Sequence, residues 1–247
     1  MSGALEAVAR LIDTEGFGSR ATVVAGPAIG QSAVIADGGL VAGELPPAIV
    51  ADVVHDAGAL LDRERSLTLT YDDHEVYLES IVPRPHLVVF GAVHIAQELV
   101  PMAGRLGFHV TVSDPRPAFI TPDRFPEASR LLVGWPDQIE LTLDRRTYVV
   151  VLSHDARFED PLWPLVLPSP VAYLGAMGST KTAARRRENL AAAGFSPEQI
   201  GRIRGPIGLE IGAESPAEIA VAILGEIIEN RARPGVPLDL RGAVTAI

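Results

Sequence analysis

The sequence predicts an α/β protein in which a small N-terminal α+β domain precedes a larger, doubly wound parallel sheet. The segment Val82-Pro83-Arg84-Pro85 interrupts regular structure, because its prolines lack a backbone donor and favour extended neighbours. Hairpin signals dominate before this segment, and short apolar runs alternate with helical patterns after it. We therefore expect one domain over residues 1–82, a linker at 83–85 and a second domain over 86–247.

The first domain is expected to contain two helices and two hairpins. Its predicted elements are a helix over 4–12, strands over 21–25 and 32–36, a helix over 46–61, and strands over 67–71 and 76–78. Asp37-Gly38 and Asp72-Asp73-His74 suit the tight turns of hairpins.

The second domain is expected to alternate strands and helices. The run Leu87-Val88-Val89-Phe90 is apolar throughout, as in a parallel strand buried on both faces. The other predicted elements are strands over 110–113, 131–134, 148–152 and 171–174, and helices over 95–106, 183–193 and 216–231. Such repeated units give a Rossmann-like sheet, whose functional edge lies at the carboxyl ends of the strands.

Two helix starts are marked directly in the sequence of this second domain. Ser196-Pro197 and Ser215-Pro216 each offer a capping serine followed by proline at the first helical position. Gln199 and Glu218 stand three residues after their serines, which is the spacing of a capping box.

Composition excludes several classes of function. The chain has 247 residues, 47% of them hydrophobic, and a formal net charge of −10, which argues against binding nucleic acid through a general phosphate field. It contains no cysteine, so disulfides, a thiol nucleophile and thiolate metal sites are excluded. We find no secretory signal and no apolar run of about 18 residues, and therefore expect a cytoplasmic protein that does not enter a membrane.

The first candidate ligand site is the turn Gly91-Ala92-Val93-His94 after the first strand of the second domain. Gly91 and Ala96 fit the dinucleotide fingerprint Gly-x-Gly-x-x-Gly/Ala, but Val93 replaces the glycine that lets the backbone approach a pyrophosphate. Asp114 ends the next strand, where an acid usually meets a ribose hydroxyl. The turn therefore either binds a nucleotide or is a plain strand-to-helix turn.

Two further candidates follow later strands of the same predicted sheet. Ser153-His154-Asp155 places a histidine beside an acid, which suits an acid/base group or a ligand contact, or else a histidine that only caps a loop. Gly178, Ser179 and Lys181 lead into a helix, where free N–H groups, hydroxyls and an ammonium suit an anion. The alternative is a glycine turn with serine as the helix cap.

Three other segments have both a functional and a structural interpretation. The glycine-rich loop 205–213 either lines the ligand cleft, with Glu210 as a polar contact, or only connects elements. Arg185-Arg186-Arg187 is expected to form a solvated helix face rather than a partner site. The apolar residues of 216–231 suit core packing or a dimer contact.

Several segments of the chain together resemble the XdhC/CoxI family. The segments that carry the resemblance are 87–96, 106–108, 114–116, 124–126, 153–155, 173–179, 206–213 and 215–220, with a weaker likeness at 20–24 and 37–38. Pro206 to Ala213 is the most specific of them, and the resemblance covers about residues 85–231.

The resemblance implies an accessory protein rather than an enzyme. Proteins of this family bind the molybdenum cofactor, as molybdopterin or its dinucleotide form, and support its sulfuration by a partner cysteine desulfurase. They then help to deliver it to a molybdenum hydroxylase such as xanthine dehydrogenase. We also expect a homodimer with no catalytic residue, and no metal cage, because the histidines show no metal-ligand spacing. The expected cofactor-binding residues are Gly91, His94, Asp114, His154, Gly178, Ser179, Lys181 and Glu210, with Ser179 and Lys181 on the phosphate.

The chain departs from the family pattern at positions that bear on cofactor binding. Val93 stands where family members usually have glycine, and neither 40–44 nor 72–74 has the cysteine found in many members. A protein thiol therefore cannot contact the cofactor. Two alternatives stay open, namely an NAD(P)-binding oxidoreductase and a divergent interaction module without a ligand.

Overall fold

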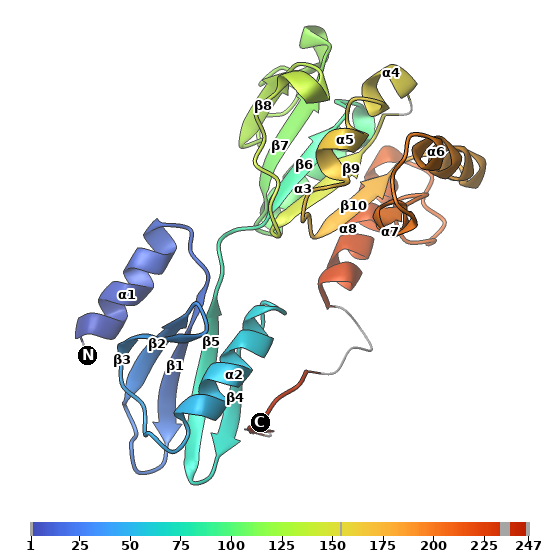
Figure 1. Ribbon diagram of the computed structural model, residues 1–247. Coiled ribbons are helices and arrows are strands. Elements are labelled where there is room, and N and C mark those ends of the chain that lie inside the picture. The colour runs from blue at the N-terminus through green and yellow to red at the C-terminus, as the bar shows by residue number, and fades with distance from the viewer. Residues whose placement is uncertain (1, 154, 233–237, 246–247) are drawn as a thin grey trace. The chain divides into compact units, whose positions relative to one another are not determined.

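The computed structural model describes residues 2–153, 155–232 and 238–245. The chain divides into two compact units, of which the first comprises Met1–Pro83 with Ala232–Ile247 and the second comprises Arg84–Arg231 (Figure 1). The predicted linker at 83–85 lies at this division. None of the described helices is both long and apolar enough to cross a membrane.

The first unit is an antiparallel sheet with a helix on each face. Its elements are α1 (Ser2–Asp13), β1 (Gly18–Ala25), β2 (Ser32–Ala36), β3 (Gly39–Gly43), α2 (Val50–Leu61), β4 (Leu67–Tyr71), β5 (His74–Ile81) and β12 (Ala243–Val244), and the strand order is β12-β4-β5-β1-β2-β3. Val34 packs against Ala4 and Ala7 of α1. Successive residues of a strand point to opposite faces of the sheet. The neighbouring Ile35 therefore packs on the other face, in the cluster that contains Val53 of α2.

The C-terminal segment belongs to the first unit, although we expected the second domain to continue to residue 247. Strand β12 pairs with β4 and forms the edge of the sheet beside it. The carboxylate of Asp56, fully buried on α2, accepts hydrogen bonds of 2.8 Å each from Tyr71 Oη and from the backbone N–H groups of Arg241 and Gly242. A buried carboxylate requires such partners, and this one finds two of them in the returning chain.

The second unit is the predicted Rossmann-like domain. Its sheet contains β6 (His86–Phe90), β7 (His109–Asp114), β8 (Arg130–Val133), β9 (Thr147–Val151), β10 (Tyr173–Ala176) and β11 (Ile203–Arg204) in the order β11-β10-β9-β6-β7-β8. All neighbouring strands are parallel. Numbered from β6, this is the 3-2-1-4-5-6 order of dinucleotide-binding folds, with the direction of winding reversed beside β6.

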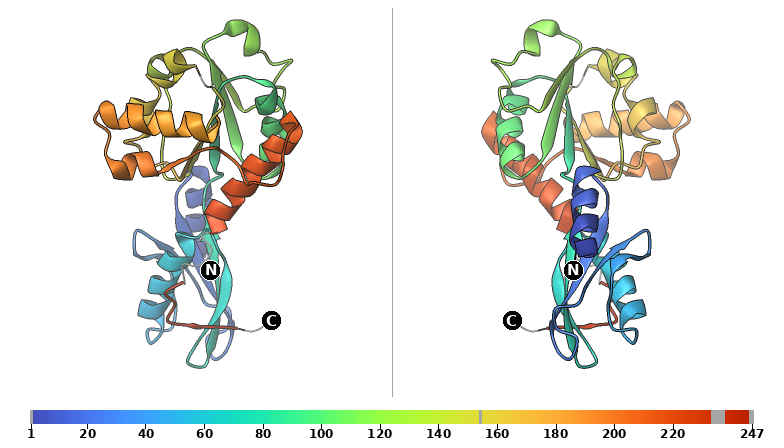
Figure 2. Two further views of the ribbon diagram at one scale, coloured as in Figure 1. Left: turned by 90° about the vertical axis from the view of Figure 1, so that its right-hand side faces the viewer. Right: turned by 90° about the vertical axis from the view of Figure 1, so that its left-hand side faces the viewer.

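Helices cover both faces of this parallel sheet, as Figure 2 shows. The helices are α3 (His94–Arg105), α4 (Ala156–Glu159), α5 (Trp163–Val166), α6 (Thr180–Ala192), α7 (Pro197–Gly201) and α8 (Pro216–Ala232), with 3-10 turns at Pro117–Phe119 and Pro136–Gln138. α3 and α8 pack on the face that contains Leu87 and Val89. α4 to α7 pack on the face that contains Val88 and Phe90, so the apolar run is buried on both sides as predicted.

The differences from the predicted elements have local causes. β10 begins two residues later than expected, because its ladder with β9 runs from Tyr173 to Ala176. β11 and β12, and the single-turn helices α4 and α5, are too short to show a period in the sequence. β3 has glycine at both ends and no buried residue, so it lacks the apolar alternation of a strand. On α8, Ile223 and Ile227 are buried in the core, as the core-packing interpretation expects, whereas Ile228 is exposed.

Candidate functional site

A cleft of about 470 Å³ opens at the carboxyl ends of β6, β7 and β9. Phe90 pairs with Ser113 of β7 on one side and with Val151 of β9 on the other, so the three strands end together. The residues that line the cleft include Gly91, Val93, Asp114, Arg116, Trp135 and Ser153. This is the switch point of the sheet, where ligands bind in folds of this order. Of the residues predicted from sequence, Gly91 and Asp114 meet here.

Gly91 allows two turns to approach each other at the floor of the cleft. Its φ is +110°, and a Cβ at this position would lie 3.2 Å from the backbone nitrogen of Ser153 and 3.3 Å from the carbonyl carbon of Leu152. Its own N–H donates to the carbonyl of Ser113 at 2.8 Å. Glycine is therefore required both for backbone conformation and for space.

Asp114 has a buried carboxylate that the protein's own donors occupy. Oδ1 accepts from the backbone N–H of Arg116 at 3.0 Å and from its Nε at 2.8 Å. Oδ2 accepts from the backbone N–H of Ala92 at 2.9 Å and from Arg116 Nη2 at 2.7 Å. A carboxylate offers about four acceptor positions, so a ribose hydroxyl finds none unless one of these partners moves.

The same contacts set the charge of Asp114. Burial alone would raise the pKa of this carboxyl, but the hydrogen bonds from Arg116 and Ala92 outweigh burial and hold the pKa below its usual range. The hydrogen bond to Asp114 raises the pKa of Arg116 in turn. Both groups are therefore charged at neutral pH, and they form a fixed ion pair at the end of β7.

The cleft has an aromatic wall that does not stand out in the sequence. Trp135 follows β8, and its ring lies 6.2 Å from that of the buried Phe158. Arg116 lies over the ring of Phe119, with 4.2 Å from its Cζ to the ring centroid. Arg116 and Trp135 come directly after strands, so the rule that singled out Asp114 points to them as well.

The Ser153-His154-Asp155 candidate is described only in part. Ser153 and Asp155 line the cleft, and Asp155 forms a bidentate ion pair with the exposed Arg157. The backbone N–H of Asp155 donates to Ser153 Oγ at 3.1 Å. His154 lies outside the described residues, so its predicted ligand contact stays a prediction.

The turn Gly178-Ser179 begins α6, and Ser179 serves as its N-cap. Gly178 has φ +140°, and Ser179 Oγ accepts from the backbone N–H of Thr182 at 3.2 Å. β9 and β10 are neighbours as expected, but neither Ser179 nor the exposed Lys181 lines the cleft. The structure thus bears out the helix-cap alternative, and anion binding at this turn stays a prediction.

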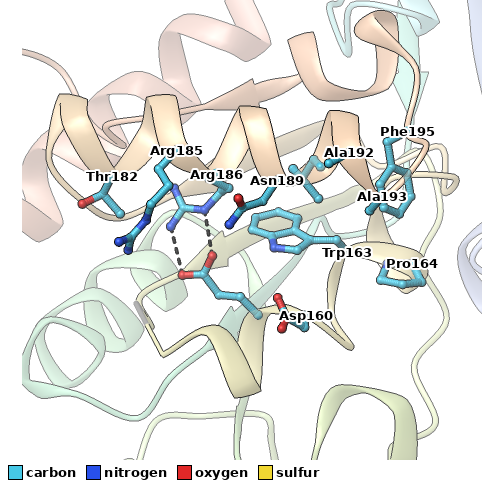
Figure 3. Close-up of a pocket in the computed structure, with 12 residues that line it drawn as sticks. Asp160, Trp163, Pro164, Thr182, Arg185, Arg186, Asn189, Ala192, Ala193 and Phe195 are labelled. Carbon is cyan, nitrogen blue, oxygen red and sulfur yellow. Dashed lines mark hydrogen bonds and ion pairs between the residues drawn. The ribbon is translucent and has the colours of Figure 1, made fainter.

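A second hollow of about 560 Å³ lies between α5 and α6, where Trp163 lies across from Asn189 (Figure 3). At its base Arg186 forms an ion pair with Glu159, with 2.8 Å from Nε to Oε2 and 2.9 Å from Nη2 to Oε1. The prediction of a solvated face was wrong for this residue, because Arg186 is only 7% exposed. It turns inward to reach an acid 27 positions away, which helical spacing does not reveal.

Arg186 also ties two loops of the carboxyl edge together. Its Nη2 donates to the carbonyl of Met177 at 2.9 Å, and its Cζ lies 5.6 Å from the Trp163 ring centroid. Glu159 ends α4, the helix that follows the loop after β9, and Met177 follows β10. One guanidinium therefore connects the segments after β9 and β10.

The glycine-rich loop 205–213 is attached to α8. The N–H of Gly208 donates to Glu226 Oε2 at 2.8 Å, and the N–H of Leu209 donates to the carbonyl of Ala222 at 3.1 Å. Tyr173 Oη donates to the same carboxylate oxygen at 2.6 Å. Burial, together with Glu226, raises the pKa of Tyr173, so this hydroxyl stays protonated.

Two other predicted residues are exposed and lie outside the lining of the cleft. Glu210 sits on the loop 205–213, and His94 is the first residue of α3. Among the described residues, no group of three or more histidine, aspartate or glutamate side chains is placed to hold a metal ion. The side chains that line the cleft include guanidinium groups, aromatic rings and the carboxylates of Asp114 and Asp155.

Comparison with known proteins points to one family. The family model described as the XdhC Rossmann domain matches residues 87–227. The chain is 32% identical over 184 residues to a Bacillus subtilis (strain 168) protein named as a probable subunit of xanthine dehydrogenase, and the match covers 72% of this chain and 54% of that protein. It is 31% identical over 97 residues to the "Molybdenum cofactor insertion chaperone PaoD" of Escherichia coli (strain K12), and this match covers 39% of this chain and 30% of that protein. The chain thus spans about half or less of these relatives.

A solved structure shares the fold over almost the whole chain. A crystal structure described as a xanthine dehydrogenase from Bacillus halodurans superposes with a TM-score of 0.72 at 21% identity. The match covers 95% of this chain and 69% of that one. At this identity, the likeness shows the fold alone.

Proposed function

Because the chain belongs to the XdhC Rossmann domain family, we propose that it is an accessory protein. In this role it binds the molybdenum cofactor for a molybdenum hydroxylase. The family match over residues 87–227 carries the proposal. Two relatives support it by name, since one is named as a probable subunit of xanthine dehydrogenase and the other as a molybdenum cofactor insertion chaperone. In this role the protein binds, shields and hands over a cofactor, and turns over no substrate.

The residues of the cleft fit such a group. Its volume of about 470 Å³ lies within the usual range for small-molecule sites, roughly 300–1,000 Å³. The molybdenum cofactor combines a flat pterin with a phosphate, and the cleft offers the aromatic ring of Trp135 and the guanidinium of Arg116. When bound, the cofactor supplies the metal centre that the recipient enzyme uses.

Sulfur transfer, if it takes place on this protein, requires a partner. The chain has no cysteine and therefore no thiol that can carry sulfur to the cofactor. We propose that a cysteine desulfurase supplies the sulfur while the cleft holds the cofactor by non-covalent contacts. The residues of this chain then contribute orientation and exclusion of water.

The geometry gives less support to nicotinamide binding. NAD requires an acceptor for its ribose hydroxyls at the end of the second strand, and the four acceptor positions of Asp114 are already occupied. Val93 also lines the cleft where the fingerprint has glycine. Nicotinamide nucleotides are therefore the appropriate competitors in a binding test.

An anaerobic titration of the ligand-free protein tests the proposal. Molybdenum cofactor, NADH and NADPH are titrated separately, and binding is followed by equilibrium dialysis. We expect micromolar or tighter binding of the cofactor and no saturable binding of NADH. Binding of a nicotinamide alone would establish the oxidoreductase alternative, and binding of none of the three would indicate an interaction module.

Delivery is tested in a second assay. The loaded protein is mixed with a cofactor-free molybdenum hydroxylase, with and without a cysteine desulfurase and cysteine. We expect the hydroxylase to gain activity, with full activity only when the desulfurase is present. Equal activation by free cofactor at the same concentration would contradict a role in delivery.

A further inference from the structure

We propose that Arg116 binds the phosphate of the ligand in the cleft and that Trp135 stacks on its planar ring system. This inference rests on the proposed function and assigns the two ends of the ligand. It differs from the expectation that Ser179 and Lys181 hold the phosphate, since neither of these residues lines the cleft.

Arg116 is oriented by the protein before any ligand arrives. Its Nε and Nη2 donate to the two oxygens of Asp114, and Phe119 covers one face of the guanidinium. A guanidinium has five N–H groups, so three stay without a hydrogen-bond partner among the described residues. Because the Arg116 side chain is 52% exposed and lines the cleft, these donors are available to a ligand.

The chemistry of this arrangement favours phosphate over other ligands. A planar guanidinium fork matches two phosphate oxygens, and charge-assisted hydrogen bonds of this kind are stronger than neutral ones. Asp114 accepts from Nε and Nη2 and Asp155 also acts electrostatically on Arg116, but no hydrogen bond among the described residues uses Nη1. Arg157 lines the same cleft as a second, more exposed guanidinium, and its Nε and Nη2 are already paired with Asp155.

Trp135 provides a flat apolar surface close to this cation. Asp114 and Val133 pair in register at the ends of β7 and β8, and Arg116 and Trp135 each follow two residues later. Trp135 is 36% exposed, and its ring packs against that of the buried Phe158. A half-exposed aromatic ring beside a phosphate-binding cation suits a heterocycle that carries a phosphate.

The phosphate assignment is tested with one pterin in two forms. The probe is the oxidised, fluorescent pterin derived from molybdopterin, used with its phosphate and again after a phosphatase has removed it. We expect removal of the phosphate to weaken binding to the wild-type protein about tenfold to a hundredfold. Arg116→Gln should weaken binding of the phosphorylated pterin by a similar factor. The variant should then bind the phosphorylated and the dephosphorylated pterin equally well.

Three further variants make the result specific to Arg116. Arg116→Lys keeps the charge but loses the fork, so it should recover only part of the discrimination. Arg105→Gln removes an exposed arginine at the far end of α3 and should bind as the wild type does. Lys181→Gln should also retain the preference for phosphate, and loss of this preference in Lys181→Gln alone would overturn the assignment.

Stacking of the pterin on Trp135 is tested by tryptophan fluorescence. The chain has two tryptophans, and of these Trp135 lines the cleft. In a Trp163→Phe variant the emission comes from Trp135 alone, and we expect the bound pterin to quench it. In Trp135→Phe the emission of Trp163 should be quenched less than the emission of Trp135 is, because Trp163 does not line the cleft. Stronger quenching of Trp163 than of Trp135 would place the ligand in the second hollow and would contradict the proposal.

Failure of this assignment differs from failure of the proposed function. Suppose that the protein binds intact cofactor, that removal of the pterin's phosphate does not weaken binding, and that the Trp135 emission does not change. This result would overturn the assignment of Arg116 and Trp135 but would leave the proposed function standing. Protein that binds neither the cofactor nor either form of the pterin overturns both.

Discussion

At the scale of single residues, Arg186 shows how a charge inside the second unit is stabilised. Its guanidinium is buried, forms two hydrogen bonds to Glu159 and one to the carbonyl of Met177, and lies over Trp163. Removal of one member leaves the other charge buried without its partner, which costs more than the pair itself contributes. The pair therefore joins the segments after β9 and β10 through one guanidinium.

Replacement of Arg186 by methionine should destabilise the second unit by about 3–5 kcal/mol, the usual cost of breaking a buried ion pair from one side. The matched control is Arg185→Met, one position earlier on the same helix and exposed, which should change stability by less than about 0.5 kcal/mol. Urea unfolding followed by circular dichroism measures both. Equal losses in the two variants would show that Arg186 is not held by its buried partners.

His86 makes stability depend on pH. Burial lowers the pKa of this histidine below its usual 6.5, and its Nε2 lies 2.8 Å from Thr111 Oγ1. Below pH 6.5 the unfolded chain binds a proton that the folded protein does not yet accept. Stability due to His86 is therefore complete above about pH 6.5 and is lost as the pH falls below it.

We expect His86→Gln to flatten this dependence, since glutamine keeps a polar partner for Thr111 but does not titrate. Unfolding free energies of wild-type protein and variant are compared between pH 5 and pH 7.5. The advantage of the wild type should shrink as the pH falls through this range. An advantage that is constant with pH would mean that His86 titrates alike in both states.

At the scale of elements, strand β12 protects the edge of the first sheet. It pairs with β4, and its neighbouring backbone N–H groups satisfy the buried Asp56. Gly242 lies against the Tyr71 ring, where a Cβ would come within 2.7 Å of Cε1 and 2.8 Å of Cζ. Tyr71 cannot easily yield, because its hydroxyl donates to Asp56.

Gly242→Ala should therefore detach β12 or displace Tyr71, at a cost of about 1–3 kcal/mol to the first unit. Amide exchange in β4 should become faster in the variant. Gly39→Ala is the matched control, since a Cβ at that position meets no atom within 4 Å. The close packing described for Gly242 would be refuted if both variants exchanged like the wild type.

The elements also show what the sequence can predict. The strand predicted at 87–90 and the helix caps predicted at Ser196 and Ser215 are formed by residues a few positions apart. The structure confirms all three. The return of residues 238–245 to the first unit depends on contacts with Asp56 and β4, more than 170 positions away. No local pattern encodes such a pairing.

At the scale of the whole molecule, the strand order determines where a ligand can bind. Parallel strands that alternate with helices predict a ligand edge, and the cleft lies at that edge with Gly91 and Asp114 in its lining. The sequence does not predict that Arg116 fills the acceptor positions of Asp114, because side-chain direction follows from packing. Nor does it reveal that Ser179 and Lys181 lie outside the cleft.

Hydrogen–deuterium exchange with and without bound molybdenum cofactor tests the location of the site most directly. We predict slower exchange in 91–93, 114–116 and the segment around Trp135, with little change at 178–182. Slower exchange at 178–182 alone, with no change in the cleft segments, would contradict this location. It would place the cofactor at the start of α6.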